Sequence, residues 1–371
     1  MNESIINRKK VRKNKSMRRA QKNAKKQFGK VRGMWAPKAK INKVVMLGSE
    51  NLFSLVPEEN TKPGIVPDEI RLSDLLEKIH QSNLKGLSGN GFSTVDKLEM
   101  LDDSKAEKKF LIVNGVECDP GLVHDSWLLK NRFDLVKQGI LVLQHVFSFE
   151  KIMIATKENI NLAGSPFPII KVPNKYPMGH EKMLIRTLLG KELTKQEIPA
   201  GQGILVMNLQ TVLMLGGIIC QGKSFTQRYV TVADLSCGRA EVALVALGTD
   251  AEEVIRTILP DGNGQKIYIG GGAMDCHEMC SGEMVDATTN FIAYGEKPDY
   301  ESATACKGCG GCTSKCPMGI PVSKIVKMDE KGDRSGLAEL HPENCIGCSA
   351  CTYVCHAGKN IKKIMAKVNG K

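Results

Sequence analysis

The cysteines near the C-terminal end constrain this chain most, because eight of its thirteen cysteines fall into two copies of one spacing. Each copy reads C-x2-C-x2-C-x3-C. This run is typical of [4Fe–4S] clusters, in which a tight loop supplies three thiolates to one cluster and the fourth cysteine ligates the other. We therefore expect two clusters with crossed ligation. One would be held by Cys306, Cys309, Cys312 and Cys355, and the other by Cys345, Cys348, Cys351 and Cys316.

Two other uses of these cysteines stay open. C-x2-C pairs also build tetrahedral zinc sites, although triplets with a displaced fourth cysteine fit two pairs of zinc ligands poorly. Disulfides form in oxidising compartments, and no signal peptide is recognisable, so reduced thiols in a cytoplasmic protein are expected. Pro317 follows the first quartet as the bacterial pattern predicts, whereas His356 follows the second.

The positive charge of the chain is concentrated at its N-terminal end. Residues 1–43 contain sixteen Lys or Arg and one acid, Glu3, a net charge of +15; the whole chain carries +12, which leaves −3 for the rest (12 − 15). Apolar residues from Met17 to Trp35 recur at three- and four-residue steps, as on one face of a helix. This basic tail is either an amphipathic helix on an anionic membrane surface, RNA or an acidic protein, or a disordered arm. Nothing downstream supports nucleic-acid binding, so no nucleic acid is expected, and no apolar run is long enough to span a membrane.

The middle of the chain alternates strand and helix patterns, which favours a parallel sheet covered on both faces. Strands are expected at 110–113, 151–155 and 203–207, and helices at 68–84, at 125–145 and beginning near 176–181. In such sheets ligands bind beyond the carboxyl ends of the strands. Asn114, Glu117 and Asn208 lie there in the sequence and are therefore candidate binding residues.

A glycine-rich loop precedes the first strand. Residues 86–94 read G-L-S-G-N-G-F-S-T, and Lys97 follows three residues later. Glycines at this density let backbone N–H groups approach a phosphate or a flavin ring, and a lysine can neutralise a phosphate. The loop alone is a weak signal, since glycine-rich turns are common.

The order of these motifs resembles that of the RnfC family of the Rnf electron-transport complex. The resemblance covers residues 69–371 and rests on the glycine-rich loop, the strand end N-G-V-E-C-D-P, the segment K-Y-P-x-G-x-E, the N-x-x-T after the third strand and the two cysteine runs. That family is similar in turn to the flavin-bearing, NADH-oxidising subunit of respiratory complex I. The stretch before residue 68 is too short for the barrel domain with which family members commonly begin.

The resemblance implies an α/β Rossmann-like flavin/NADH-type domain, a small β-grasp domain of the SLBB type and a helical ferredoxin-type domain with two [4Fe–4S] clusters. The expected parts are the basic tail at 1–43, the Rossmann-like domain at 44–222, the β-grasp domain at 223–298 and the dicluster domain at 299–371. Within the β-grasp part, strands are expected at 228–232, 244–249 and 266–269.

The resemblance also implies an FMN site, with NADH as a further candidate ligand. Gly86, Gly89, Gly91 and Lys97 would surround the phosphate and ring; Asn114 and Glu117 would lie near the ring; Asn208 and Thr211 would lie near the ribityl chain or phosphate; Glu181 would belong to the nucleotide pocket. Each has a plain structural alternative, such as a helix cap for Asn208. No catalytic residue is assigned.

The chain departs from the family at the glycine-rich loop, which is usually G-x-G-G-A-G-F-P-T. Ser88 and Asn90 stand where the family has small residues, and their side chains would either intrude on a stacked ring or hydrogen-bond a ligand. Ser93 replaces a proline, which is expected to loosen the loop. Farther on, Cys276, His277 and Cys280 form an unexpected group that is either a metal or redox site or buried thiols beside a surface histidine.

Two functions follow from the resemblance. In the first, the chain relays electrons between a flavin/nicotinamide site and a partner redox protein, as part of an NADH/ferredoxin-type oxidoreductase. In the second, the nucleotide pocket has decayed and the chain is a non-catalytic electron-transfer adaptor, as in proline reductase or cobalamin reductase systems. The expected partners are ferredoxin-like proteins, reductases or membrane electron-transport subunits, with peripheral membrane contact through the basic tail as one alternative.

Overall fold

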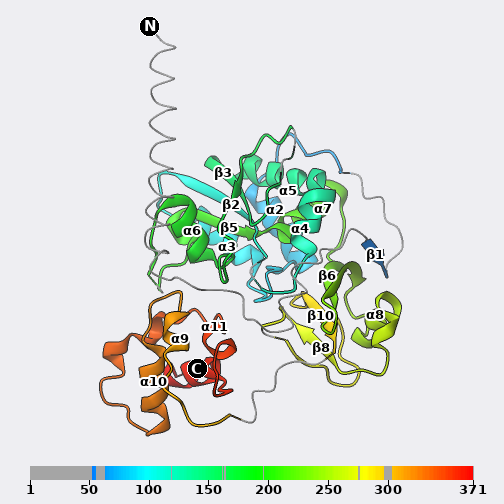
Figure 1. Ribbon diagram of the computed structural model, residues 1–371. Coiled ribbons are helices and arrows are strands. Elements are labelled where there is room, and N and C mark those ends of the chain that lie inside the picture. The colour runs from blue at the N-terminus through cyan, green and yellow to red at the C-terminus, as the bar shows by residue number, and fades with distance from the viewer. Residues whose placement is uncertain are drawn as a thin grey trace. The chain divides into compact units, whose positions relative to one another are not determined.

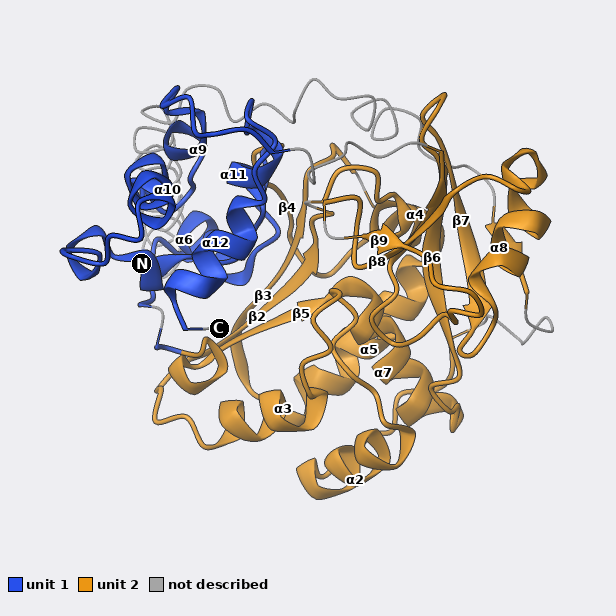
Figure 2. Ribbon diagram, turned by 90° about the horizontal axis from the view of Figure 1, so that it is seen from below, with its two compact units in different colours: residues 1–37, 175–197, 298–371 blue, residues 38–174, 198–297 orange. Residues whose placement is uncertain are grey.

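The computed structural model describes residues 52–55, 63–117, 119–160, 162, 164–194, 196–274, 276–295 and 303–370, so the basic tail lies outside the described residues. Figure 2 shows two compact units. Within the described residues, unit 1 joins 175–197 to 303–370, and unit 2 contains the rest. The predicted boundary near residue 223 falls inside unit 2, so the division into three domains stays a prediction. Among the described helices, none has the length and apolar character needed to cross a bilayer.

Unit 2 contains the predicted parallel sheet (Figure 1). Its strand order is β4-β3-β2-β5, and every neighbouring pair is parallel. The strands are β2 (Lys109–Gly115), β3 (Phe149–Thr156), β4 (Ile169–Lys171) and β5 (Ile204–Asn208). The apolar run of β2 is buried on both faces, as expected for a central parallel strand. The Rossmann-like part of the fold prediction is therefore confirmed.

The helices of this part are α2 (Leu72–Ser82), α3 (Thr94–Asp102), α4 (His124–Asn131), α5 (Phe133–Val146) and α7 (Leu209–Gln221). The single helix expected at 125–145 is wrong, because the chain leaves helical geometry at Arg132, where φ is −136° and ψ is 30°. Helices α5 and α7 approach closely through Gly139, whose Cβ, if present, would lie 1.9 Å from the Val212 carbonyl oxygen. A larger residue at 139 would therefore separate the two helices.

Unit 2 also contains a six-stranded sheet in the order β1-β7-β6-β10-β8-β9. Its elements are β1 (Leu52–Ser54), β6 (Gln227–Asp234), β7 (Arg239–Ala246), α8 (Ala251–Ile258), β8 (Ile267–Gly270), β9 (His277–Glu278) and β10 (Phe291–Tyr294). Strand β10 runs parallel to β6 and antiparallel to β8. Strands β6 and β7 form a hairpin, helix α8 follows, and the last strand, β10, lies beside β6. This is the β-grasp arrangement, to which β1 is added. The SLBB subtype stays a prediction. The strand expected at 244–249 begins and ends earlier.

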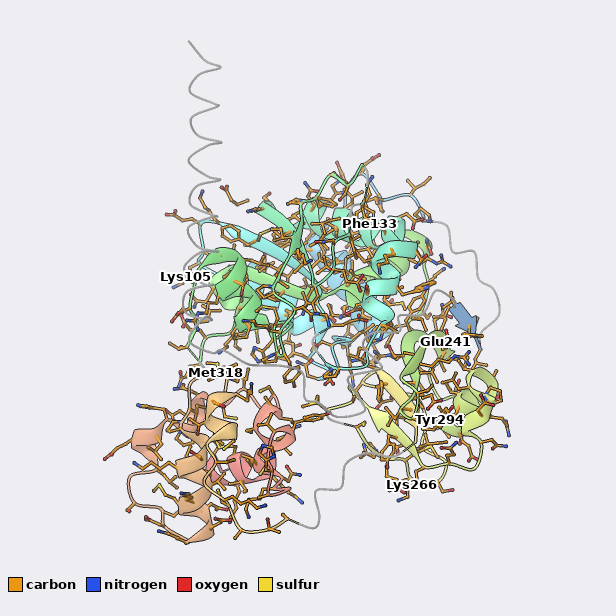
Figure 3. The ribbon with its side chains drawn as sticks, viewed as in Figure 1. Lys105, Phe133, Glu241, Lys266, Tyr294 and Met318 are labelled. Carbon is orange, nitrogen blue, oxygen red and sulfur yellow. The ribbon has the colours of Figure 1, made fainter. Side chains whose placement is uncertain are left out.

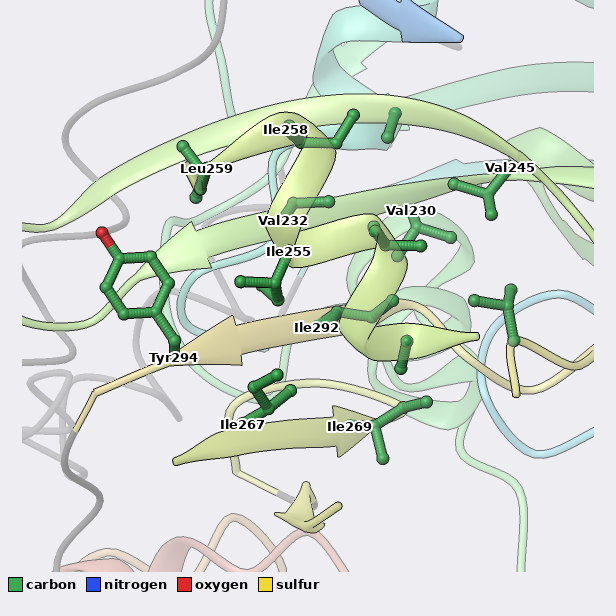
Figure 4. Packing of buried hydrophobic residues seen from close by; sticks show 14 residues of the cluster. Val230, Val232, Val245, Ile255, Ile258, Leu259, Ile267, Ile269, Ile292 and Tyr294 are labelled. Carbon is green, nitrogen blue, oxygen red and sulfur yellow. The ribbon is translucent and has the colours of Figure 1, made fainter. Parts of the chain in front are cut away.

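The core of this sheet lies beneath α8 (Figure 4). Val254, Ile255 and Ile258 of α8 pack against Val232 and Ile292 of the central strands, and all five are buried. The three helix residues recur at spacings of one and three, so they form one apolar stripe that the sheet covers. This packing holds the strands that carry part of the candidate site.

Unit 1 is built around the two cysteine runs. Its helices are α6 (Glu181–Leu189), α9 (Gly311–Ser314), α10 (Val322–Glu330), α11 (Ala350–Tyr353) and α12 (Ile361–Val368). Short 3₁₀ turns occur in the two units at Ala200–Gln202, Pro260–Gly262, Ala338–Leu340 and Pro342–Asn344.

The two halves of the cysteine region repeat the same backbone. Gly308 and Gly347, at the same place in the two runs, both have φ of +69°. The Thr313 hydroxyl accepts the Ser323 N–H at 2.9 Å, and in the second half the Thr352 hydroxyl accepts the Lys362 N–H at 2.8 Å. Each copy is thus a cysteine loop whose threonine fixes the start of the following helix, α10 or α12.

Candidate iron–sulfur and flavin sites

Four cysteines from the two runs line one cavity. Cys345, Cys348 and Cys351 come from the second run, and Cys316 is the displaced cysteine of the first; Met318, labelled in Figure 3, also lines the cavity. Three ligands from one loop and the fourth from the other copy form the set predicted for one [4Fe–4S] cluster. The crossed ligation stays a prediction, and this cavity supports it.

The charges that shift the pKa values of the thiols group the cysteines into the two ligand sets expected from the sequence. Burial, then the charges of Cys348, Cys345 and Cys316, raises the pKa of Cys351 to about 12. Burial likewise raises the pKa of Cys348 to about 11. Because iron binds the thiolate, cluster assembly must remove these protons, and the cationic cluster offsets the cost of burying the charges.

The other set surrounds Cys312. Burial raises the pKa of Cys312, and the charges of Cys355 and Cys306 raise it further. Cys312 is buried, whereas Cys309 is exposed. Cys312 therefore lies near the displaced cysteine of the second run, as crossed ligation requires for the first cluster.

A segment far from the cysteines in sequence contacts the second loop. The Tyr176 hydroxyl donates a hydrogen bond to the Cys348 carbonyl, and a cis peptide bond joins Tyr176 to Pro177. Both residues belong to the predicted K-Y-P-x-G-x-E segment, and its Glu181 begins α6 in unit 1. The other predicted flavin residues lie in unit 2, so the role of Glu181 stays a prediction. No sequence pattern indicated that Tyr176 reaches a cysteine loop.

The group at 276–280 is not arranged as a metal site. The buried Cys276 thiol donates to the Ala273 carbonyl at 3.5 Å, and His277 Nε2 lies 2.7 Å from a Glu283 carboxylate oxygen. Cys280 is exposed. Among the described residues, no three Cys, His, Asp or Glu side chains are grouped to hold a single metal ion.

The glycine-rich loop is held at both ends in unit 2. The Gly86 N–H donates to the Phe92 carbonyl at 2.7 Å, and the Leu87 N–H donates to the Thr211 hydroxyl at 2.9 Å. Gly89 and Gly91 have φ of +97° and +62°, a region that side chains disfavour. The loop conformation therefore depends on these two glycines, and the predicted residue Thr211 fixes the loop to α7.

The three departures from the family loop are accommodated. Ser88 and Asn90 are exposed, and the Ser88 hydroxyl lies 3.2 Å from the Asn90 side-chain oxygen. The expectation that Ser93 loosens the loop is wrong, because its hydroxyl accepts the Asp96 N–H at 3.1 Å and caps α3. Serine is a favoured N-cap residue, so it replaces the rigidity of proline with a hydrogen bond.

Polar side chains meet where β2 and β5 end. Asn114 and Asn208 are neighbours in the sheet register. Asn208 caps α7, as its structural alternative predicted, and its amide also donates to an Asp125 carboxylate oxygen at 2.8 Å. Glu117 accepts the Asp125 N–H at 2.6 Å. The structure thus brings these three predicted residues to the same end of the sheet, and Asp125, which the sequence analysis missed, bonds to Glu117 and Asn208.

Glu117 and Asp125 form a buried acidic pair. Burial, followed by the charge of Asp125, raises the pKa of Glu117 to about 8. Burial raises the pKa of Asp125 to about 7, against a smaller lowering by its hydrogen bond from Asn208. The pair therefore holds a proton near neutral pH, as close buried carboxyls do.

Arg228 of β6 joins the glycine-rich loop to the β-grasp sheet. It is fully buried, and its guanidinium donates to the Ala287 carbonyl, the Asn290 side-chain oxygen and, at 3.4 Å, the Leu87 carbonyl. Burial lowers the pKa of Arg228 to about 9. Sequence reasoning missed Arg228, because an arginine in a strand ordinarily points to solvent.

Lys97, predicted to neutralise a phosphate, is engaged inside the fold. Its ammonium donates to the Val206 carbonyl at 3.0 Å and lies 5.6 Å from the centroid of the Phe92 ring. Its phosphate role stays a prediction. One observation fits a bound ligand at this site: a buried Asp125 carboxylate oxygen has no hydrogen-bond partner among the described residues.

Comparison with known proteins agrees with both candidate sites. The Nuo51 FMN-binding domain family matches residues 79–216, and the 4Fe–4S dicluster domain family matches residues 305–360. The chain is 28% identical over 259 residues to the RnfC component of the ion-translocating oxidoreductase complex of Pseudomonas aeruginosa, covering 66% of this chain and 33% of that protein. The protein of the same name from Rhodobacter capsulatus is 26% identical over 296 residues, or 75% and 56% of the two chains.

A solved structure supports the fold. A chain of a NAD+-reducing [NiFe]-hydrogenase in the H2-reduced state has a TM-score of 0.55 at 16% identity, covering 79% of this chain and 60% of that one. The present chain spans about one third to just over half of the curated relatives' lengths. The resemblance drawn from the sequence is confirmed: the chain is similar to the RnfC components of ion-translocating oxidoreductase complexes, and it matches the Nuo51 FMN-binding domain family followed by the 4Fe–4S dicluster domain family.

Proposed function

We propose that this chain transfers electrons between a flavin/nicotinamide site and a partner redox protein through two [4Fe–4S] clusters. The observation that carries the proposal is the cavity lined by Cys345, Cys348, Cys351 and Cys316, because cysteines from both copies of the motif line it. When bound, the clusters would transfer one electron at a time, and the flavin would transfer one or two electrons. The side chains supply ligands, placement and exclusion of water.

Unit 2 provides the flavin side of this proposal. The loop from Gly86 to Ser93 is fixed by Thr211 and Arg228, so a planar ligand would meet a preformed surface. The Glu117 and Asp125 carboxyls hold a proton near neutral pH and lie beyond the ends of parallel strands, where such sheets bind ligands. A proton held there limits the negative charge that an electron-rich ligand would face.

The partner is proposed to be a further redox protein, since the named relatives are components of ion-translocating oxidoreductase complexes. Whether this chain joins such an assembly is part of the proposal. The basic tail, a candidate for membrane contact, lies outside the described residues.

The test is anaerobic purification of the full chain after reconstitution with iron, sulfide and excess FMN. The proposal predicts about eight irons per chain and a flavin absorption band that NADH bleaches. Eight irons without any bound flavin would favour the non-catalytic adaptor. A protein that binds zinc in place of iron would contradict both.

A further inference from the structure

The two cysteine loops share a backbone but differ in their surroundings. Adding 39 to a residue number of the first copy gives its counterpart in the second, as Cys306 and Cys345 show. By this rule the exposed Lys307 corresponds to the half-buried Ile346, and the exposed Lys327 corresponds to Ala366. At these two positions the first copy presents cations and the second presents apolar side chains.

The cations of the first copy form a patch beside an exposed ligand. Lys324, Lys327 and Lys331 follow one another at three- and four-residue steps along α10 and its end, so they share one side of the helix. The Lys327 ammonium lies 2.9 Å from the position that a Cβ on Gly308 would take, next to the exposed Cys309. We call Lys307, Lys324, Lys327 and Lys331 the lysine patch.

The charge of the lysine patch is not cancelled by nearby acids. Within the described residues, none of its four ammonium groups pairs with a carboxylate, and all four side chains are exposed. The neighbouring acids are already engaged: Asp329 with Lys367 at 3.0 Å, and Glu330 with Lys359 at 2.7 Å. The patch therefore keeps a positive field over the first loop.

The second loop lacks such an opening. The Tyr176 hydroxyl donates to the carbonyl of Cys348, that cysteine is half-buried, and Ser349 and Ala350 are buried. Electron-transfer partners meet through small, transient surfaces, steered by complementary charge. An exposed cation patch at one cluster and a more buried loop at the other distinguish an outer from an inner redox centre.

Resting on the proposed function, we propose that the first cysteine loop and the lysine patch dock a small electron-carrier protein with a carboxylate-rich surface. The first cluster is then the one that exchanges electrons with that carrier. The second cluster exchanges electrons with the carrier only by way of the first cluster. The step is a one-electron exchange: one reduced carrier cluster is oxidised as one cluster of this chain is reduced, with no proton or atom transferred.

The test uses the full chain with both clusters loaded and oxidised, mixed in a stopped-flow instrument with a reduced, strongly acidic ferredoxin as the probe. Lys307→Glu combined with Lys327→Glu should lower the second-order rate about tenfold or more at low salt. The difference should vanish near 1 M NaCl, where charges are screened. The tail is present in every variant, so it cannot cause the difference.

The matched control comes from the repeat itself. Lys324→Glu and Lys363→Glu change the same position of the two copies by the same charge, and only the first should slow the reaction by more than about threefold. Equal rates for both would overturn the proposal. So would variants that react normally with ferredoxin but lose binding to phosphatidylglycerol vesicles, since the patch would then serve a membrane. Failure of the clusters to assemble in the unaltered chain would instead contradict the proposed function.

Discussion

The two cysteine loops have one backbone design and two environments. In both loops the second residue after the first cysteine is a glycine with φ of +69°. Both loops lead to a helix whose first turn donates an N–H to a threonine hydroxyl. Yet Cys309 is exposed beside lysines, while burial raises the pKa of its counterpart Cys348 to about 11. The comparison teaches that one cysteine spacing can be built into two environments, and we propose that the residues between the cysteines determine which cluster can meet a partner.

The largest predicted effect is on the ligand set that joins the loops. Cys316→Ala should remove the second cluster and leave the first, so the iron content should fall from about eight to about four per chain. Iron analysis with electron paramagnetic resonance of the reduced protein would measure this. Cys355→Ala is the matched variant and should remove the first cluster. If Cys316→Ala damaged only the first cluster, the ligation would be uncrossed.

The next effect concerns removal of iron. Because Cys309 is exposed and Cys348 is half-buried, an iron chelator should strip the first cluster several-fold faster than the second. Absorbance and iron release over time would measure both phases.

Exchanging one residue between the loops sharpens this comparison. Lys307→Ile should slow the fast phase, and Ile346→Lys should accelerate the slow one, because each gives its loop the other's side chain. Two phases that did not respond to either exchange would show that the loop residue has no part in protecting the cluster.

A smaller effect is expected at Tyr176. Tyr176→Phe keeps the ring and removes the hydrogen bond to the Cys348 carbonyl, so the reduction potential and resonance spectrum of the second cluster should shift. The first cluster should be unchanged. Tyr294→Phe is the control, since it also removes a tyrosine hydroxyl, one that bonds to Asp234 in unit 2 at 2.7 Å. A shift of equal size in both clusters would assign Tyr176 a general structural role.

The smallest effect tests the symmetry of the repeat. Thr313→Val and Thr352→Val each remove one hydroxyl that accepts a helix N–H, and each should lower the free energy of unfolding by about 1 kcal/mol. Denaturant unfolding of the cluster-loaded protein would compare them. Losses that differ by several-fold would mean that the two halves are not held alike.

Much of the fold could be predicted because its signals are local. Apolar runs marked β2, β3 and β5 to within a few residues, and the cysteine spacing identified the dicluster region. The break at Arg132 between α4 and α5 was missed, because apolar periodicity continues across it and only backbone geometry shows the interruption. Ser93 was misjudged because the comparison with proline considered rigidity and overlooked helix capping.

The site could be predicted less completely, because its decisive contacts join distant residues. Glu117 and Asn208 were expected at strand ends, but Asp125, which bonds to both, lies in a helix start that has no motif. Arg228 contacts Leu87 across 141 residues, and Tyr176 contacts Cys348 across 172. Such pairings depend on tertiary packing, which a single sequence does not reveal.

The most direct test of the difference between the loops uses proteins that keep only one cluster. Electron transfer from reduced acidic ferredoxin should proceed near the normal rate in Cys316→Ala, which keeps the first cluster. It should be at least about tenfold slower in Cys355→Ala, which keeps the second, because no lysine patch steers the carrier there. Equal rates, or a faster reaction in Cys355→Ala, would contradict the assignment of the first cluster as the outer redox centre.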